Sequence, residues 1–426
     1  MMRGQRLVCG SILAACCLIT SCQVTQTSPQ KKSLKIGTLL PITGDLSAYG
    51  TPMQETANLL VKTVNDCNGV LGQPVTLVSA DDQTDPAQAT QAMTKLVEVD
   101  RVVGVVGAAS SAASSAAVAI AVRNQVMQIS PASTSPIFTE RANRGEFKGF
   151  WARTAPPDTF QSQALAQLAH QKGFKSVAIL AINNDYGNGL VTAFILAFQA
   201  LGGTVTNEAS PSLYDPNTST FDSEIKKVFA GEPDAVLLVA YPETGSLILK
   251  SAQELGFLDG KTQIITTDGM KEANIAKLVG KDTQGKFIVT GILGTSPSAG
   301  GPALEAFQKR YRQVFKREPA VFDPNTWDAV ALLVLAAEAA KETTGSALQS
   351  QLQVVANPPG QEVTDVCAAL ALLRAGQSIN YQGASGRVDL NPQGDVVGSY
   401  DVWTIDERGK LQVKDTIEIG GAETSK

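Results

Sequence analysis

The chain has 426 residues, of which 43% are hydrophobic and 18% are charged, so it is long enough for two globular domains. Its 35 basic and 40 acidic residues give a formal net charge of −5, and no basic block could neutralise a phosphate backbone. The composition therefore argues against nucleic acid as a partner.

The N-terminal 21 residues have the features of an export signal. Arg3 and Arg6 precede an apolar segment, residues 7–18, that is too short to span a membrane permanently. The string "LITSC", ending at Cys22, resembles a bacterial lipobox, in which the cysteine is lipidated before cleavage. We expect residues 22–32 to be a polar tether and the protein to be a membrane-anchored lipoprotein in the periplasm or at the cell surface.

Short apolar runs alternate with helix-length amphipathic segments from Leu34 onward, which is typical of parallel sheets covered by helices. Helices are predicted over residues 51–67, from Pro86 with Asp85 as its cap, and over a serine-rich segment after residue 109. Strands are predicted within "LKIGTLLPIT", "PVTLVSA", "VVGVVG" and "VMQISPA".

A second round of the same pattern follows "FWARTAPPDTF". Its predicted strands are "SVAILAI", "AVLLVAY", "QIITTDG" and "KFIVTGI", separated by helices. Two long helices over residues 302–315 and 327–341 come next, and "GRVDL", "SYDVWTI" and "KLQVKDTIEI" are predicted to be the final strands. The fold class is therefore predicted as α/β, with two doubly wound lobes. A Tyr-Gly pair after the first strand of each round suggests that the lobes are related.

The segment "GAASSAA" places Ser110 and Ser111 where the strand 102–107 ends and a helix begins. Unpaired backbone N–H groups and the positive end of the helix dipole gather there, so the site could hold a carboxylate. Serine is also a common helix cap, and from the residues alone this structural role stays open. We expect Ser114 and Ser115 to be surface or packing residues.

The next turn, "ISPASTSP", holds Ala132, Ser133 and Thr134 between two prolines that restrict its backbone. Fixed carbonyl and hydroxyl groups in this turn could accept hydrogen bonds from an ammonium group. An ordinary loop is the alternative.

Seven strings in order resemble the branched-chain-amino-acid-binding family of periplasmic solute receptors for ABC importers. The resemblance covers Leu34 to about Ile405 and implies two lobes, joined by a three-strand hinge, that close over a small ligand. The strings are "IGTLLPITGDLSAYG", "ADDQTDPAQA", "GAASSAA", "ISPASTSP", "RTAPPDTFQ", "NNDYGNGL" and "TTDG".

The resemblance implies a role for particular residues. The hydroxyl and N–H of Ser111, with the N–H of Thr134, would bind an α-carboxylate. The Ala132 carbonyl, the Thr134 hydroxyl and, from the opposite lobe, Asp268 would bind the α-ammonium. Asp268 departs from the glutamate common in amino-acid receptors, and it is one methylene shorter. The implied pocket walls are Tyr49, Tyr186, Tyr241 and Phe322.

The resemblance also implies a monomer that delivers a neutral or branched-chain amino acid to the permease and ATPase subunits of an ABC importer. No cofactor, metal or catalytic residue is expected. Hinge crossings are predicted near Arg153, Thr290 and Trp403. The predicted boundaries combine residues 33–153 with 291–402 in lobe 1, and 154–290 with 403–426 in lobe 2.

Three cysteines lie in the predicted signal and Cys22 is predicted to carry lipid, which leaves Cys67 and Cys367. In an oxidising compartment these two could form a disulfide that closes a long loop, or they could be two separately buried thiols. They are not the closely spaced pair of the best-known family members, so the pairing stays open.

Two alternatives compete with an amino-acid receptor. An enzyme is disfavoured because His170 is the only histidine, no G-x-S-x-G motif occurs, and "ADDQTDP" lacks the spacing of a calcium loop. A binding or sensor protein for amides, urea or aromatic acids would have the same fold. The chemistry of the bound ligand would distinguish this second alternative from an amino-acid receptor.

Overall fold

The computed structural model describes residues 33–419. The predicted signal segment, the lipobox cysteine Cys22 and the tether lie outside the described residues. Within residues 33–419, no helix combines the length and the apolar character needed to cross a bilayer.

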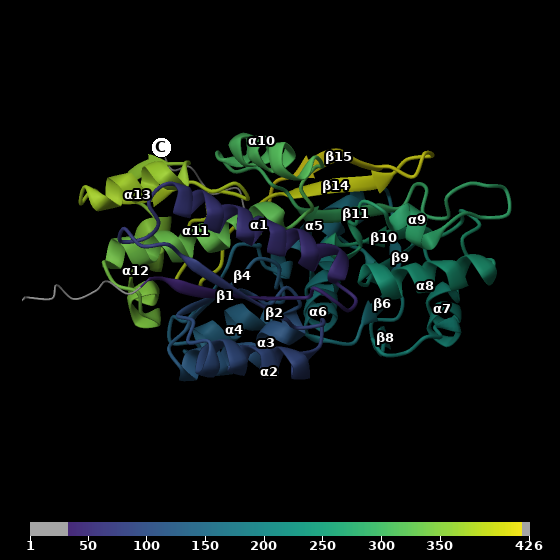
Figure 1. The fold of residues 1–426 in the computed structure, drawn as a ribbon. Coiled ribbons are helices and arrows are strands. Elements are labelled where there is room, and N and C mark those ends of the chain that lie inside the picture. Colours follow the sequence, from purple (N-terminus) through teal and green to yellow (C-terminus); the bar gives the residue numbers. More distant parts are fainter. Residues whose placement is uncertain (1–32, 420–426) are drawn as a thin grey trace, which may run out of the picture. The chain divides into compact units, whose positions relative to one another are not determined.

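The first lobe is built on a five-stranded, all-parallel sheet with the strand order β2-β1-β3-β4-β5. Neighbouring side chains on a strand point to opposite faces, and Val105 and Val106 accordingly enter two different hydrophobic cores. One core includes helix α1 and the other includes α2 and α3, so the sheet is covered on both faces (Figure 1). The elements are β1 Lys35–Leu40, α1 Ser47–Asp66, β2 Thr76–Asp81, α2 Pro86–Thr94, the π-helical turn Lys95–Val99, β3 Gly104–Gly107, α3 Ser111–Arg123, β4 Met127–Ser130, α4 Ile137–Asn143 and β5 Trp151–Arg153.

The first lobe is completed by a segment from much later in the chain. Figure 1 shows the green helices α11 and α12 beside the purple α1 and β1, and α11 shares the hydrophobic core of α1. Nearly every residue of α11 is buried, which explains its continuous apolar sequence. The segment comprises α10 Leu304–Phe315, α11 Asp323–Ala340, α12 Gly345–Ala356, β12 Gln361–Val363, α13 Val366–Arg374 and β13 Ile379–Tyr381.

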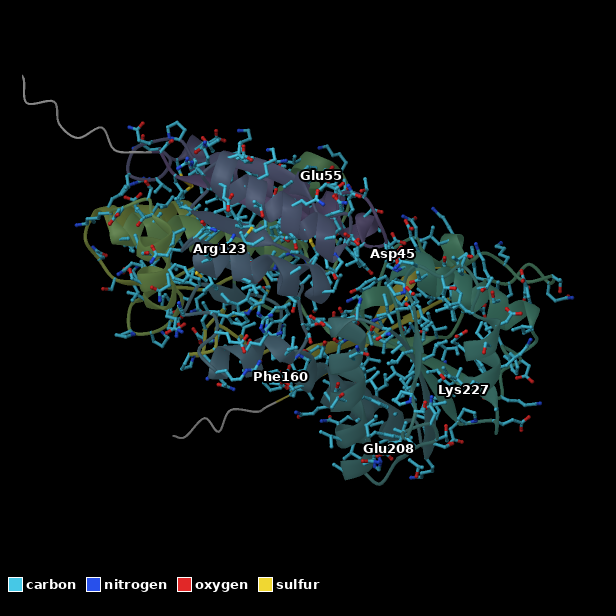
Figure 2. The ribbon with its side chains drawn as sticks, turned by 90° about the horizontal axis from the view of Figure 1, so that it is seen from below. Asp45, Glu55, Arg123, Phe160, Glu208 and Lys227 are labelled. Carbon is cyan, nitrogen blue, oxygen red and sulfur yellow. A yellow bond between two sulfur atoms is a disulfide. The ribbon has the colours of Figure 1, made fainter. Side chains whose placement is uncertain are left out.

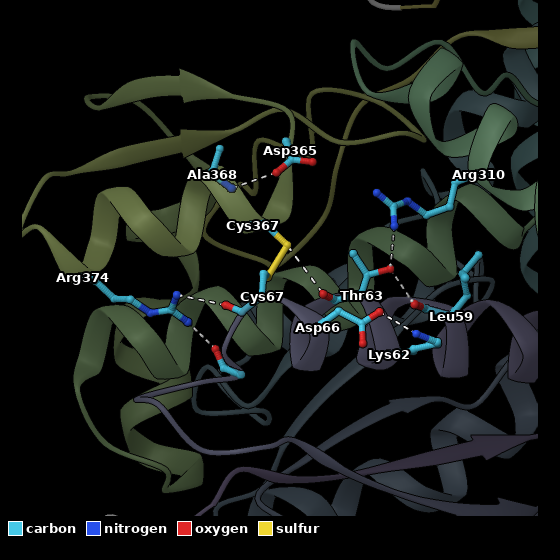
Figure 3. Close-up of a disulfide and its surroundings, with 11 residues drawn as sticks. Leu59, Lys62, Thr63, Asp66, Cys67, Arg310, Asp365, Cys367, Ala368 and Arg374 are labelled. Atoms are coloured by element: carbon cyan, nitrogen blue, oxygen red, sulfur yellow. Dashed lines mark hydrogen bonds and ion pairs between the residues drawn. A yellow bond between two sulfur atoms is a disulfide. The ribbon is translucent and has the colours of Figure 1, made fainter.

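A disulfide joins Cys67, just after α1, to Cys367 in α13, with 5.9 Å between their Cα atoms (Figure 3). Arg374 supports the same corner because its guanidinium donates to the backbone carbonyls of Cys67 and Gly69. The covalent link therefore fastens the late helical segment to the first helix of the lobe.

The second lobe contains an eight-stranded sheet in which β15-β14-β11-β10-β9-β6-β7 are neighbours and β8 also pairs with β6. Its strands are parallel except for the antiparallel pairs of β14 with β11 and β15. The elements are α5 Asp158–Gln171, β6 Ser176–Ile182, α6 Asp185–Ala200, β7 Thr204–Val205, β8 Ser212–Tyr214, α7 Asp222–Phe229, β9 Ala235–Val239, α8 Pro242–Glu254, β10 Gln263–Thr266, the 3₁₀ turn Asp268–Met270, α9 Ile275–Val279, β11 Leu293–Pro297, β14 Tyr400–Ile405 and β15 Leu411–Ile417.

The chain passes between the two sheets three times: after Arg153, after Pro297 and before Tyr400. The predicted lobe boundaries after residues 290 and 402 cut through the second sheet, because β11 pairs with β10 and the whole of β14 pairs with β11. By strand pairing, residues 293–297 and 400–402 group with the second lobe.

Two predicted strands are wrong. Residues 286–292, "KFIVTGI", form turns that end at Gly291 with φ +85°, and the strand begins only at Leu293. Residues 386–390, "GRVDL", form no strand because Val388 adopts φ +55°. The side-chain amide of Asn357 bonds both the N–H and the carbonyl of Leu390, in place of a neighbouring strand.

The repeated Tyr-Gly pair has the same structural cause in both lobes. Each pair lies in the first turn of a helix that follows the lobe's first strand, α1 or α6. A Cβ atom on Gly50 would lie 1.9 Å from the carbonyl oxygen of Pro41, and one on Gly187 would lie 1.9 Å from that of Ile182. Glycine therefore lets the helix approach the end of the strand, and the adjacent tyrosine is held beside it.

Candidate ligand-binding site

The predicted site residues follow the carboxyl ends of parallel strands. In the first lobe Tyr49 follows β1, Ser111 follows β3, and Ala132 and Thr134 follow β4. In the second lobe Tyr186, Tyr241 and Asp268 follow β6, β9 and β10. Open α/β sheets bind ligands at this edge, because the loops and helix N-termini meet there. Phe322 does not follow a strand: it is the residue immediately before helix α11.

Residues from both lobes line a small cavity. Its walls contain all the predicted site residues except Thr134, and they also contain four that were not predicted: Leu46, Met53, Ala109 and Gly269. Every lining residue except Ala132 is buried. The wall is mainly apolar, with Ser111 and Asp268 as its only non-aromatic polar side chains.

Ser111 is the first residue of α3, whose N-terminal N–H groups have no partners within the helix. Its hydroxyl oxygen accepts from the N–H of Ser135 at 3.3 Å, so the hydroxyl proton can point toward an anion. Ser110 occupies the cap position, but its side chain makes no capping bond, and its buried hydroxyl lies instead near the Tyr241 hydroxyl, whose pKa it lowers. The plain capping role therefore does not account for Ser110.

A buried hydroxyl network holds the two first-lobe loops together. Ser114 and Ser130 both donate to the carbonyl of Ala108, and the Ser133 hydroxyl lies 2.8 Å from the Ser114 hydroxyl and 3.2 Å from the same carbonyl. Ser114 is fully buried, so of the two roles expected for it, packing is the one observed. This network fixes the loop before α3 against the loop after β4.

Thr134 lies beside the cavity rather than in its wall. It is buried, and within residues 33–419 its hydroxyl forms no hydrogen bond of good geometry, although it lies close enough to Asp158 to lower the pKa of that carboxyl group. Its carbonyl accepts from the N–H of Asp158 at 2.8 Å. Thr134 therefore links the first-lobe loop to the start of α5 in the second lobe.

Asp268 is the acidic group of the cavity wall and is 3% exposed. Its Oδ1 accepts from the Tyr186 hydroxyl at 3.1 Å. Burial raises the pKa of Asp268 to about 6, although hydrogen bonds from Gln161 and Tyr186 act in the opposite direction. Lys271, three residues later, bonds instead to Ser296 at 2.7 Å and Asp401 at 3.3 Å.

A second buried acid, Asp158, was not predicted as a site residue. It is fully buried at the start of α5, and within residues 33–419 neither carboxylate oxygen accepts a hydrogen bond of good geometry, although the Thr134 side chain lies nearby. Burial first, and then the charge of Asp268, raises its pKa well above the ordinary value, while Thr134 and Arg153 act in the opposite direction. Within residues 33–419 neither acid forms an ion pair with lysine or arginine. Two buried carboxyls without an ion-pair partner are costly, which points to a cationic ligand group.

Aromatic side chains form the walls in two pairs, one on each lobe. Tyr186 and Tyr241 stack with 5.7 Å between ring centroids, and Tyr49 meets Phe322 edge to face at 6.0 Å. The Tyr49 hydroxyl also reaches the second lobe, where it is 3.3 Å from the carbonyls of Asp268 and Gly269. A second contact between the lobes runs from the Ser135 hydroxyl to the Asp185 carbonyl at 2.7 Å. The lobes are thus closed around the cavity.

A larger polar hollow opens between the lobes next to the cavity, and Tyr241 borders both. Its charged lining residues are all acidic: Asp45, Asp85 and Asp215. Figure 2 places Asp45 at the edge of the first lobe that faces the second. Burial, and then the charge of Glu243 on the other lobe, raises the pKa of Asp45 to about 6.

Two other predictions concern the enzyme and metal alternatives. His170 lies exposed on α5, the helix position expected for it. In the part of the chain that the structure describes, no three His, Cys, Asp or Glu side chains are grouped to hold a metal ion. Asp85 caps α2 through a 2.8 Å bond from the Gln88 N–H, as predicted.

Comparison with known proteins identifies the family. The model described as "Receptor family ligand binding region" matches residues 52–408. A chemotactic signal transduction system substrate-binding protein of Halobacterium salinarum is 26% identical over 404 residues, with 90% of each chain covered.

Solved structures share the fold. A leucine-binding protein of Thermotoga maritima is 26% identical, with 90% of this chain and 99% of that chain covered and a TM-score of 0.75. A solute-binding protein of an ABC transporter from R. palustris, solved with benzoate, is 19% identical, with coverage of 91% and 97% and a TM-score of 0.72. The chain belongs to the receptor ligand-binding-region family and is a solute-binding protein of the type I periplasmic binding protein fold, not an enzyme.

Proposed function

We propose that the protein binds an α-amino acid with an apolar side chain, of the neutral or branched-chain class, in the cavity between its lobes. One observation carries this proposal: the cavity wall holds Ser111, at a helix N-terminus of one lobe, and Asp268, from the other lobe with Asp158 buried near it, while the rest of the wall is mainly apolar. An α-carboxylate would bind at the helix N-terminus with Ser111, and an α-ammonium would bind at the buried acids.

Each predicted contact has a specific role in this proposal. The Ser111 hydroxyl and N–H, with the Thr134 N–H, would bind the carboxylate. The Ala132 carbonyl, the Thr134 hydroxyl, Asp268 and the unpredicted Asp158 would bind the ammonium. The Thr134 hydroxyl and the Asp158 carboxylate lie close together but form no hydrogen bond of good geometry, and buried polar atoms in this situation are rare in proteins. This supports their roles as ligand contacts. The ligand side chain would contact Leu46, Met53, Tyr49 and Phe322.

An aromatic acid is the second candidate, because a benzoate-binding protein has the same fold. Benzoate would supply the carboxylate and fill the apolar space. It would leave Asp158 and Asp268 without a cation, however, and would add a third negative charge near them. Amides and urea would lack a full charge for either end. The pair of acids therefore favours an amino acid.

We propose further that the protein is a monomeric lipoprotein, anchored through Cys22, that delivers its ligand to the permease and ATPase subunits of an ABC importer. Family membership and the lipobox-like string at Cys22 support this role. A chemotaxis receptor is the alternative partner, since one relative is a substrate-binding protein of chemotactic signalling. Labelling with a radioactive fatty acid, compared between wild type and Cys22→Ala, tests the anchor.

The decisive experiment identifies the ligand directly. Mass spectrometry of the solute that co-purifies is followed by calorimetric titration of refolded, ligand-free protein with the twenty amino acids. The matched panel is leucine, leucinamide, 4-methylpentanoate and benzoate. We expect leucine-like amino acids to bind far more tightly than analogues that lack either charged group. Tighter binding of benzoate or an amide than of every amino acid would refute the proposal.

A further inference from the structure

Arg153 is fully buried at the end of β5, the last first-lobe strand before the chain crosses to the second lobe. Its guanidinium is bonded on three sides. Nε pairs with Asp395 at 2.7 Å, Nη2 donates to Thr139 at 2.8 Å, and Nη1 donates to the carbonyls of Ser133 at 3.1 Å and Ser135 at 2.9 Å.

The two carbonyls bound by Nη1 flank Thr134. The third carbonyl of this stretch, that of Thr134 itself, accepts from the N–H of Asp158. All three successive carbonyls are thus fixed, and the Thr134 side chain is held next to the Asp158 carboxyl group, with no hydrogen bond of good geometry to its hydroxyl. Neither Arg153 nor Asp395 lines the cavity.

Arg153 and Asp395 are held firmly themselves. The second carboxylate oxygen of Asp395 accepts from Thr139 at 2.7 Å, and the Asp395 N–H donates to Asn391. The Arg153 N–H donates to the carbonyl of Gly394 at 2.9 Å. A planar fork of N–H donors is required for this arrangement, and a lysine ammonium cannot supply it.

We propose that Arg153, with Asp395 as its counter-ion, is a positioning residue for the ammonium end of the ligand site. It acts through the Ser133–Ser135 loop on Thr134 and Asp158 without touching the ligand. This inference rests on the proposed function and assigns a role to residues outside the cavity.

The charge of Arg153 gives the role a second, electrostatic part. Asp158 lies within the influence of Asp268 on the 3₁₀ turn, Arg153 on β5, Tyr186 on α6 and Tyr400 on β14. Among these, Arg153 is the only cation, and its charge lowers the pKa of Asp158. A lower pKa keeps the carboxylate ionised, as an ammonium ligand requires.

The test is calorimetric titration with leucine from pH 5 to pH 8, on wild type and three variants. Arg153→Lys keeps the charge but loses the fork, so we expect a loss of about tenfold or more in affinity, since hydrogen bonds to charged groups are among the stronger ones. Arg144→Lys, on a half-exposed arginine after α4, is the matched control and should leave affinity unchanged.

The other two variants distinguish a positioning role of Arg153 at the ligand site from a general loss of stability. Arg153→Met removes the cation, so the pH at which affinity is lost should rise. Asp395→Asn removes the counter-ion, so the pKa of Asp158 should fall and the same midpoint should move to lower pH. A purely structural ion pair would lower the melting temperature in both variants without opposite shifts of the pH profile.

If Arg153→Met does not fold, Arg153→Lys and Asp395→Asn still test whether Arg153 positions the ligand site. Unchanged leucine affinity in folded Arg153→Lys, or an unshifted or upward-shifted pH profile in Asp395→Asn, overturns the inference. A wild type that binds no amino acid at any pH overturns the proposed function instead.

Discussion

The carboxyl group of Asp158 lies close enough to that of Asp268 for each charge to disfavour the other, although one begins α5 and the other follows β10. Both are buried in the second lobe. Their pKa values are raised mainly because burial disfavours the charged forms. A bound ammonium group would offset both the burial and the mutual repulsion.

Replacing Asp268 with alanine should weaken amino-acid binding by roughly 2 to 5 kcal/mol, the range for removing one partner of a buried charge pair. Calorimetry with leucine measures the loss. Glu272→Ala, a few residues along the same loop but outside the cavity wall, is the control. Undiminished affinity in Asp268→Ala would remove Asp268 from the site.

Ligand binding should depend on pH with a definite sign. The raised pKa values mean that the unliganded acids hold protons at low pH, so affinity should be full above these pKa values and fall as pH drops through about 6. Titrations near that pH, in buffers of different ionisation enthalpy, should show proton release on binding. Asp158→Asn should weaken binding and flatten this dependence. Tighter binding at pH 5 than at pH 8 would contradict the prediction.

The acidic rim of the cleft should oppose closure. Asp45 on the first lobe is near Glu243 on the second, and its pKa is raised to about 6 in the closed form. Closure therefore favours its protonation. Asp45→Asn should raise affinity about two- to fivefold at pH 8, as partly exposed charge pairs contribute up to about 1 kcal/mol. At pH 5 the ratio of variant to wild-type affinity should return toward one. Weaker binding by Asp45→Asn at pH 8 would show that the carboxylate assists closure.

The disulfide should stabilise the first lobe without affecting the ligand site. Its cysteines are 300 residues apart in sequence, and removing such a link typically costs roughly 2 to 5 kcal/mol. Cys67→Ser with Cys367→Ser should therefore unfold at lower temperature and denaturant concentration. Leucine affinity below the melting transition should match wild type, since neither cysteine lines the cavity. A large loss of affinity in the folded variant would show that this corner controls closure.

The sequence predicted much of the fold because local patterns carry it. Buried strands such as β6, "SVAILAI", are continuous apolar runs, and the site residues follow the ends of such runs. The sequence-based prediction of two strands was wrong because a single backbone angle prevents each strand. Gly291 and Val388 adopt positive φ, and the apolar pattern of the sequence does not reveal these angles. The family-level prediction is confirmed by the match over residues 52–408, whereas the ligand contacts stay predictions.

The site residues that were not predicted depend on contacts that a local sequence pattern does not contain. Asp158 follows Pro157 at a helix start, where an acidic residue is ordinary, and only its burial beside Asp268 marks it as unusual. Asp395 meets Arg153 from a distant part of the chain, and nothing local to either residue predicts the contact. The disulfide is a similar case. The two cysteines are far apart in sequence, and their distance in space is set only when α13 packs near α1.

The contacts between the lobes have a kinetic consequence. Tyr49 reaches across to Asp268 and Gly269, and Ser135 reaches across to Asp185, so these contacts have to break before the lobes can separate. The residence time of a bound solute is then set by the rate at which the lobes separate. Whatever partner receives the solute has to speed that separation, and variants that merely hold the lobes together more firmly would bind more tightly yet hand over their cargo more slowly.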